Sequence, residues 1–197
     1  MRLVCASANP KKVDEIARLV PGWVTLVPRP DDVGGIDETA PTLEGNAIIK
    51  AVEIANHTGE WALADDTGLV VDALDGEPGV RSARFAGDDA TDAENRALLL
   101  QRLQKATDRR ARFRTVLAVV HASGEIHVLS GECDGTIATG ERGTNGFGYD
   151  SVFIPSGGDG RTFAEMTPRE KDALSHRANA LRQLPGLLAR IFGSPTA

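Results

Sequence analysis

The sequence predicts an α/β fold with a mixed β-sheet, and two observations lead to this class. Short apolar runs typical of strands alternate along the chain with stretches whose apolar residues recur at helical spacing. Later in the chain, two apolar runs are separated by a tight polar turn, which indicates an antiparallel hairpin. With 197 residues, of which 41% are hydrophobic and 25% charged, the chain suits a single domain, or two closely packed lobes, with a substantial core.

The first predicted elements are a short strand and a capped helix. Residues 2–6 are an apolar run typical of a buried strand. Asn9 followed by Pro10 predicts a helix start, because asparagine is a favoured cap and proline a favoured first helical residue. Apolar residues then recur at helical spacing until Pro21-Gly22 ends the helix. Residues 27–41 are rich in Pro, Gly and Asp and are expected to form an exposed loop.

The central part of the chain is predicted to hold two helices and two short strands. Residues 43–57 present one apolar face and are followed by Gly59, which is typical of a helix end. Residues 61–64 and 69–71 are apolar and are expected to flank an acidic turn. Residues 91–104 begin with a capping-box pattern and continue as a leucine-rich helix.

The last third of the chain contains the hairpin and a return to helix. The runs 113–121 and 126–130 predict its two strands, and a third strand is expected around residues 133–138. Helical pattern returns at Thr167 and continues to Ile191. The residues after Phe192 are expected to form a frayed tail.

Charge and composition exclude several classes of protein. The chain has 22 basic and 28 acidic residues and a net charge of -6, which does not suit a protein that coats a nucleic-acid polymer. Its apolar runs fall short of the roughly 18 residues of a membrane span, and the apolar run near its first residue is too short for a signal peptide. Two cysteines are too few for a disulfide scaffold. We expect a cytoplasmic protein that would bind phosphate through a local cation cluster or a metal.

Two segments place cations on the start of a helix or on one helix face. A helix amino terminus attracts phosphate, and the turn before the first helix adds lysine charge; the residues are Ser7, Ala8, Asn9, Pro10, Lys11 and Lys12. The alternative is an ordinary capped turn. Asn46 and Lys50 are four residues apart and share a helix face, which alone also fits an exposed surface pair.

Adjacent carboxylates form the third segment, Asp65-Asp66-Thr67-Gly68. A carboxylate at a strand end suits Mg²⁺, which prefers one or two carboxylates together with phosphate oxygens. It could equally orient an attacking water. The alternative of a simple aspartate turn fits the spacing as well.

Aromatic and basic side chains mark two later segments. Residues 143–150 alternate glycines with Phe147 and the single tyrosine of the chain, Tyr149; such rings either stack a purine base or fill the core. Lys171 and His176 lie about 140° apart on a continuous helix. They converge only if the helix breaks near Leu174, in which case a new helix starts after Ser175.

At this point the chain resembles the inosine triphosphate pyrophosphatase (ITPase) family, the bacterial XTP/dITP diphosphatases, over essentially its whole length. The matching stretches occur in the family's order; they are SANPKKVDEI, TLEGNAIIKA, ALADDTGLVVDALDGEPGVRSARFAG, GTNGFGYD and EKDALSHRANAL. The long central stretch and GFGYD are the most specific of them.

The resemblance implies a homodimeric enzyme with an elongated mixed sheet and flanking helices that form two lobes around a nucleotide cleft. It implies Mg²⁺-dependent hydrolysis of dITP, ITP and XTP to monophosphate and pyrophosphate, which keeps these purines out of DNA and RNA. The Ser7–Lys12 loop would hold the triphosphate, and Asp66 would be proton acceptor and metal ligand. The substrate contacts implied further along the chain are Thr67, Phe147, Gly148, Tyr149, Asp150, Lys171, His176 and Arg177.

Two positions depart from the family pattern. Gly45 stands where the family usually has a metal-binding Glu, and Glu44 lies one residue earlier, a rotation of about 100° on a helix. Glu44 reaches a metal only if this is an irregular first turn. Ser151 stands where a proline usually follows the GFGYD Asp. The displaced Glu favours one alternative, a nucleotide-binding module without catalysis; another is a pyrophosphatase for modified pyrimidine or methylated nucleotides.

Overall fold

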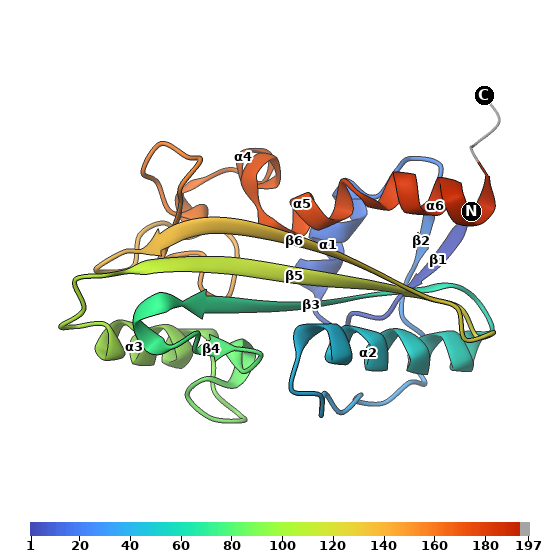
Figure 1. The fold of residues 1–197 in the computed structure, drawn as a ribbon, viewed down its shortest axis with the longest axis horizontal. Coiled ribbons are helices and arrows are strands. Elements are labelled where there is room, and N and C mark those ends of the chain that lie inside the picture. Colours follow the sequence, from blue (N-terminus) through green and yellow to red (C-terminus); the bar gives the residue numbers. More distant parts are fainter. Residues whose placement is uncertain (194–197) are drawn as a thin grey trace. The chain divides into compact units, whose positions relative to one another are not determined.

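The structure is a computed structural model and describes residues 1–193 (Figure 1). The tail expected after Phe192 therefore falls almost wholly outside the described residues. The elements are β1 (Arg2–Cys5), α1 (Pro10–Leu19), β2 (Thr25–Val27), α2 (Leu43–Thr58), β3 (Ala62–Val71), η1 (Asp72–Leu74), β4 (Pro78–Gly79), η2 (Ser82–Arg84), α3 (Asp92–Arg102), β5 (Arg110–Val120), β6 (Ile126–Ile137), β7 (Phe153–Pro155), η3 (Phe163–Glu165), α4 (Pro168–Leu174), α5 (His176–Leu181) and α6 (Leu184–Phe192).

The strands form one mixed sheet, so the predicted α/β class is confirmed. The strand order is β2-β1-β3-β5-β6-β7, and β4 also pairs with β3. β1 runs parallel to both β2 and β3, whereas the β3–β4 and β6–β7 pairs are antiparallel. Helix α1 connects β1 to β2 and α2 connects β2 to β3, which suits the parallel pairs, whereas residues 72–77 and 138–152 connect the antiparallel pairs.

The chain divides into two compact units, which we call unit 1 and unit 2. Unit 1 comprises residues 1–66, 115–131 and 177–197, and unit 2 comprises residues 67–114 and 132–176. In unit 1, α2 lies on one face of the strands and α6 on the other (Figure 1). The core on the α6 side joins side chains from β1, α1, β3, β5 and the last two helices; among them are Leu3, Ile16, Leu63, Leu117 and Leu184.

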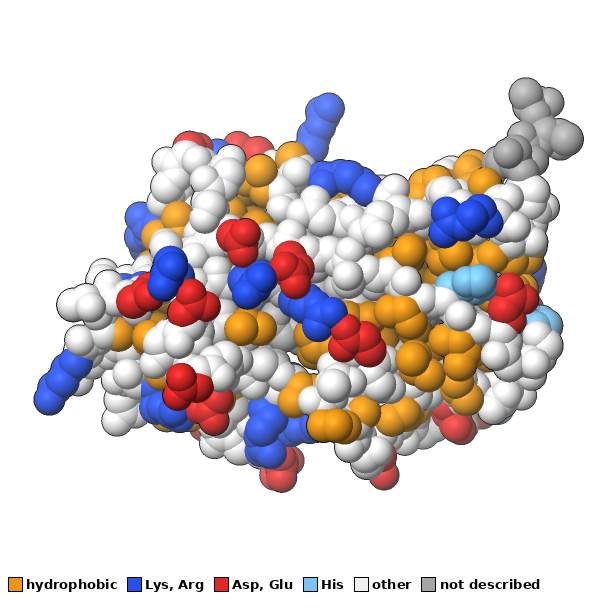
Figure 2. Space-filling view, viewed as in Figure 1, with side chains coloured by type: hydrophobic (Ala, Val, Ile, Leu, Met, Phe, Trp, Pro, Cys, Tyr) orange, Lys and Arg blue, Asp and Glu red, His pale blue; other side chains and the backbone are white. Residues whose placement is uncertain are grey.

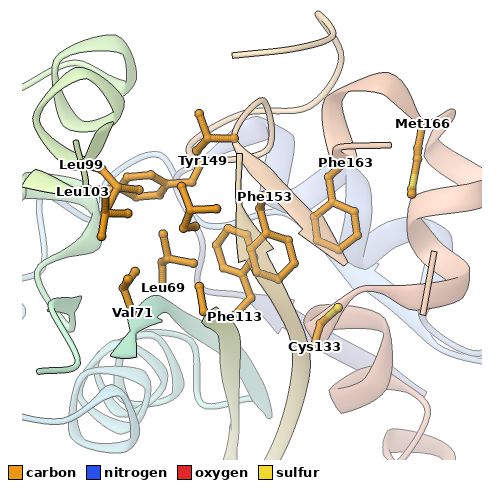
Figure 3. Packing of buried hydrophobic residues seen from close by; sticks show 13 residues of the cluster. Leu69, Val71, Leu99, Leu103, Phe113, Cys133, Tyr149, Phe153, Phe163 and Met166 are labelled. Atoms are coloured by element: carbon orange, nitrogen blue, oxygen red, sulfur yellow. The ribbon is translucent and has the colours of Figure 1, made fainter. Parts of the chain in front are cut away.

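Unit 2 has its own core, which contains a group of aromatic rings. The rings of Phe113 and Phe153 meet edge to face with centroids 4.7 Å apart, and Phe163 packs 5.2 Å from Phe153. Figure 3 shows these three rings together, with Tyr149 beside Leu99 of α3 and Leu103, the residue after that helix. Each unit therefore has a buried apolar cluster of its own.

Most predicted elements are present, but two strand predictions are wrong. The expected acidic turn between residues 64 and 69 is absent, because β3 continues through it. The strands expected at 126–130 and 133–138 are one strand, β6, whose even-numbered residues stay exposed from Ser130 to Thr136. That alternation has the period of a single strand, so the glycine at position 131 does not interrupt it.

Within residues 1–193, no helix has the length and apolar character that crossing a bilayer requires. Blue and red side chains are interspersed on the face that Figure 2 shows. On this face, basic side chains do not form the continuous stripe that binds a nucleic-acid backbone.

Two glycine-to-alanine substitutions should have opposite effects on stability. At Gly135 in β6, a Cβ would lie 2.3 Å from the backbone oxygen of Ile154 and 2.5 Å from Cζ of Phe153, so Gly135→Ala should lower the free energy of unfolding by about 1–3 kcal/mol. At Gly186 in α6 no atom lies within 4 Å of such a Cβ. Gly186→Ala should raise stability by about 0.5–1 kcal/mol. Urea unfolding of both variants measures this, and changes of the same sign would contradict it.

Candidate active site

Asp65 and Asp66 are adjacent buried residues of β3, and their side chains pair with different partners. Successive side chains of a strand point to opposite faces, so two adjacent carboxylates need separate cations. Cations from distant parts of the chain pair with each of them. This pairing is the physical reason why the strand continues where the sequence alone predicts a turn, since an unpaired buried carboxylate would be costly.

Asp65 lies in a buried group of charges in unit 1. The guanidinium of Arg177 donates to Oδ2 of Asp65 from Nη2 at 3.0 Å and from Nε at 3.3 Å, and Nη1 of Arg177 donates to Glu15. Nζ of Lys12 lies 3.2 Å from the same Asp65 oxygen. Burial alone would raise the pKa of Asp65, but the charges of Lys12, Arg177 and Lys50 outweigh it and hold this pKa well below its usual range.

The turn before α1 positions Lys12 and matches its predicted start. Oδ1 of Asn9 accepts hydrogen bonds from the backbone N–H groups of Lys11 at 3.0 Å and Lys12 at 3.3 Å, and the N–H of Val13 bonds to the Asn9 carbonyl. These N–H groups are thus already bonded within the turn. A phosphate at this end of α1 would therefore have to be bound by side chains, chiefly those of the two lysines and Ser7.

Asp66 pairs with Lys50 of α2, and Lys50 also pairs with Glu38. Nζ of Lys50 lies 2.9 Å from Oδ1 of Asp66 and 3.0 Å from Oε1 of Glu38. Burial raises the pKa of Asp66, the charge of Lys50 opposes that rise, and the charge of Glu38 adds to it. Burial lowers the pKa of Lys50, but the neighbouring carboxylates reverse this and raise it above its ordinary value. Lys50 is therefore charged at neutral pH.

The second oxygen of Asp66 is a buried acceptor. Asp66 is 6% exposed, and its Oδ2 has no hydrogen-bond partner within residues 1–193. No group of three or more His, Cys, Asp or Glu side chains in that part of the chain could hold a metal by itself. A buried carboxylate oxygen beside a second carboxylate, that of Glu38, fits a cation such as Mg²⁺ that completes its oxygen ligands with substrate phosphate.

Glu38 is the residue of this site that sequence reasoning missed. It lies in the loop before α2, where no local pattern marks it. The side chain of Asn46 fixes this loop, because its Oδ1 accepts a hydrogen bond of 2.9 Å from the backbone N–H of Ala40. A Cβ at Gly45 would lie 2.5 Å from that of Ala40, so the glycine that departs from the family pattern permits this close packing. Glu44 is half-buried in the first turn of α2, and its metal role stays a prediction.

Lys50 and Asn46 therefore do not form an exposed surface pair. Both side chains are buried. Asn46 contacts the loop before α2, and Lys50 contacts Asp66 within β3. The shared helix face predicted from their spacing is the face that carries the site.

Unit 2 holds a second group of predicted residues around the glycine-rich loop 143–150. Nζ of Lys171 lies 2.6 Å from Oδ2 of Asp150, and the same oxygen accepts a hydrogen bond of 2.9 Å from the backbone N–H of Phe147. The Lys171 ammonium also lies 5.0 Å from the centre of the Phe147 ring. At Gly146, φ is +75° and a Cβ would lie 2.0 Å from Oδ2 of Asp150, so only glycine fits there.

The two aromatic residues of this loop have different surroundings. The ring of Tyr149 is buried in the core of unit 2, and its hydroxyl donates to the carbonyl of Ser82 at 2.8 Å. Burial raises the pKa of Tyr149 above its ordinary value. Phe147 is half-buried. Of the two possibilities that the sequence left open, Tyr149 therefore fills the core, whereas Phe147 is not among the buried residues of that core.

The predicted helix break is present. α4 ends at Leu174, Ser175 has an extended backbone, and α5 begins at His176. The ring of His176 stacks on Phe113 in unit 2 with centroids 4.4 Å apart. Arg177, 1% exposed, belongs to unit 1 and is engaged by Glu15 and Asp65. Thr67 follows Asp66 directly in β3 and is half-buried.

The mixed sheet and the paired carboxylates and lysines define an α/β protein with a buried, charged site on β3. The chain belongs to the Ham1 family, whose model matches residues 3–186. It is 45% identical to a dITP/XTP pyrophosphatase of Christiangramia forsetii, over 96% of this chain and 100% of the relative. This match confirms the family resemblance predicted from the sequence.

Solved structures agree with this assignment. A HAM1 protein from Coxiella burnetii has a TM-score of 0.87 and 42% identity, and the match covers 96% of this chain and 99% of that one. A nucleoside-triphosphatase / dITP/XTP pyrophosphatase from Mycobacterium abscessus has a TM-score of 0.75 and 45% identity, over 95% of this chain and 100% of that one.

Replacing Arg177 should show how much unit 1 depends on its buried charges. Arg177→Met leaves Asp65 and Glu15 buried without their shared partner and should lower the free energy of unfolding at pH 7 by about 3–5 kcal/mol. As a control, Arg2→Met removes an ion pair with Glu60 in which both side chains are exposed and should lower stability far less. Urea unfolding provides the measurement, and equal losses would contradict the prediction.

The same pair of proteins gives a pH test. Because the folded-state pKa of Asp65 is lowered, its stabilisation is complete above the unfolded value of about 3.9 and is lost as pH falls towards the folded value. The stability difference between wild type and Arg177→Met should therefore be constant near neutral pH and narrow below about pH 4.

Proposed function

We propose that this protein hydrolyses deaminated purine nucleoside triphosphates, such as dITP, ITP and XTP, to the monophosphate and pyrophosphate. The observation that carries this proposal is the buried carboxylate of Asp66, held by Lys50 beside Glu38, with one oxygen open to a further partner. Relatives that match nearly the whole chain and are named dITP/XTP pyrophosphatases support the substrate class. Such an enzyme would remove these purines before they enter DNA or RNA.

In unit 1, the proposed roles concern the triphosphate and a metal. Asp66 and Glu38 would hold Mg²⁺, since their carboxylates contact the same lysine and therefore lie close together. When bound, Mg²⁺ would neutralise negative charge on the phosphate oxygens. Lys11, Lys12 and Ser7 would bind the triphosphate at the start of α1. We assign the second carboxylate to Glu38 because Glu38 and Asp66 both contact Lys50. The assignment of Glu44 rests on the family pattern.

Asp66 is the proposed proton acceptor. Its raised pKa makes it a stronger base than an ordinary aspartate, while Lys50 keeps it oriented. Asp66 would take a proton from water as the water oxygen attacks the α-phosphorus. The bond between that phosphorus and the bridging oxygen breaks, and pyrophosphate leaves with the electron pair. Positioning and charge supply most of the rate in such phosphoryl chemistry.

In unit 2, the proposed roles concern the nucleoside. Phe147 would stack on the purine, and Lys171, held by Asp150, would supply a hydrogen-bond donor beside that ring. A donor suits the 6-oxo group of a deaminated purine and would be left unpaired by the amine of adenine. A base contact by the Arg177 side chain would require it to leave Glu15 or Asp65.

Further proposals concern assembly and location. We infer a homodimer and a cytoplasmic protein from the family resemblance, and sedimentation would distinguish a dimer from a monomer. The alternative of a binding module without catalysis drew on the displaced Glu44. Glu38 offers another carboxylate at Lys50, so that ground for the alternative is weaker.

Asp66→Asn should reduce kcat for pyrophosphate release from ITP with Mg²⁺ by about 10²–10⁴-fold, because the amide cannot accept the proton. Asp72→Asn, at an exposed aspartate just after β3, should keep normal turnover. Urea midpoints of both variants establish that they are folded. Near-normal turnover by folded Asp66→Asn would remove this residue from the proposed role.

A substrate panel tests the function itself. We expect kcat/KM for dITP, ITP and XTP to exceed that for ATP by at least about a hundredfold, with activity lost on removal of Mg²⁺. Equal rates for all purines would contradict the proposed specificity. Saturable binding of ITP without pyrophosphate release would instead support the binding module.

A further inference from the structure

Helix α3 holds the backbone of the loop that carries Phe147 and Asp150. Oδ2 of Asp92 accepts a hydrogen bond of 2.8 Å from the backbone N–H of Gly148. Nη1 of Arg96 donates a hydrogen bond of 2.8 Å to the carbonyl of the same glycine. The N–H belongs to the peptide that follows Phe147 and the carbonyl to the next peptide, so the two peptide planes at Gly148 are both held.

The two side chains that hold Gly148, those of Asp92 and Arg96, share one face of the helix. Asp92 and Arg96 are four residues apart in α3, the spacing that brings helical side chains together. Thr91 and Glu94 form a capping box that fixes the first turn of the helix. The two side chains that hold Gly148 therefore belong to a helix rather than to another loop.

Arg96 is itself oriented by Glu141 and Ser151. Nε of Arg96 donates to Oε2 of Glu141 at 2.8 Å, and the Ser151 hydroxyl donates to the same oxygen at 2.9 Å. Ser151 is the residue that stands where the ITPase-family pattern has proline, and a proline has no hydroxyl for this bond. The departure from the pattern therefore completes a chain of hydrogen bonds that ends at Gly148.

Gly148 needs such a restraint. Its φ is +58°, a left-handed conformation that glycine adopts readily but does not hold by itself. A free glycine loop would have to be ordered when the ligand binds, which weakens binding. With Gly148 held by α3, and Phe147 N–H held by Asp150, the loop is ordered beforehand.

We propose that Asp92 and Arg96 are positioning residues for nucleoside binding, which fix the Gly148 backbone and thereby the Phe147 ring. This inference rests on the proposed function, because it assumes that the loop binds the nucleoside of the substrate. It concerns binding of the base and sugar and leaves the phosphate chemistry of unit 1 unaffected.

Steady-state kinetics with ITP, and calorimetric binding of IMP and of inorganic pyrophosphate, test the inference. In Arg96→Ala and in Asp92→Ala we expect KM for ITP and Kd for IMP to rise roughly tenfold, the size of one hydrogen bond to a charged group. We expect kcat to stay within about threefold of wild type and the Kd for pyrophosphate to be unchanged. Arg96→Lys, which keeps one charged donor, should recover part of the loss.

Arg102→Ala is the matched control, since Arg102 lies on the same helix and pairs with Glu77 in an exposed ion pair. It should leave KM and IMP binding unchanged. If Arg96→Ala does not fold, Asp92→Ala and Arg96→Lys decide the question.

Two kinds of result overturn the inference. One is a KM for ITP within about twofold of wild type in both folded alanine variants. The other is a loss shared by Arg102→Ala, or a fall in kcat at constant KM. If wild-type protein releases no pyrophosphate from ITP, the proposed function fails instead, and this outcome is visible before any variant is made.

Discussion

The ion pair between Arg177 and Asp65 is the interaction on which unit 1 depends. It joins residues 112 positions apart in the sequence, and the contact of Arg177 with Glu15 spans 162 positions. Unit 1 is assembled from three separate stretches of chain, and this pair ties the last of them to β3 and α1. Its burial makes it costly to form without good geometry, and equally costly to break at one side.

This pairing also gives the two adjacent aspartates different electrostatic surroundings. Asp65 is held by Arg177 and Lys12, and its pKa is lowered, so it remains an anion with fixed partners. Asp66, on the opposite face of the strand, meets only one lysine among the residues the structure describes, and its pKa is raised by burial. The pKa values of two adjacent residues of identical type thus shift in opposite directions because their surroundings differ.

Local patterns predicted much of this fold. The Asn9 cap, the capping box at Thr91 and the break after Leu174 are all present, because each depends on residues a few positions apart. The candidate residues of unit 1 and of the glycine-rich loop were also recognisable, since the family motifs are contiguous in sequence. Each of these features is determined by residues that lie close together in the sequence.

Features set by distant partners were not predictable in the same way. The continuation of β3 through Asp65 and Asp66 requires cations from α1, α2 and α5, which no window around the strand contains. Glu38 lies in an irregular loop, and only its packing beneath α2 brings it to Lys50. The core position of Tyr149 depends on Ser82 and α3, both far away in the sequence.

Both units contain a buried aspartate paired with a lysine, and the two pairs differ in how many carboxylate contacts they make, which is why we propose only one of them for catalysis. In unit 2, Oδ2 of Asp150 binds both Lys171 and the backbone N–H of Phe147, so its carboxylate is committed to shaping a loop. In unit 1, Lys50 binds Oδ1 of Asp66, while Oδ2 has no partner within residues 1–193. A buried carboxylate oxygen without a hydrogen bond lowers the stability of the folded state. Such a loss of stability is expected at atoms that bind a metal or a substrate.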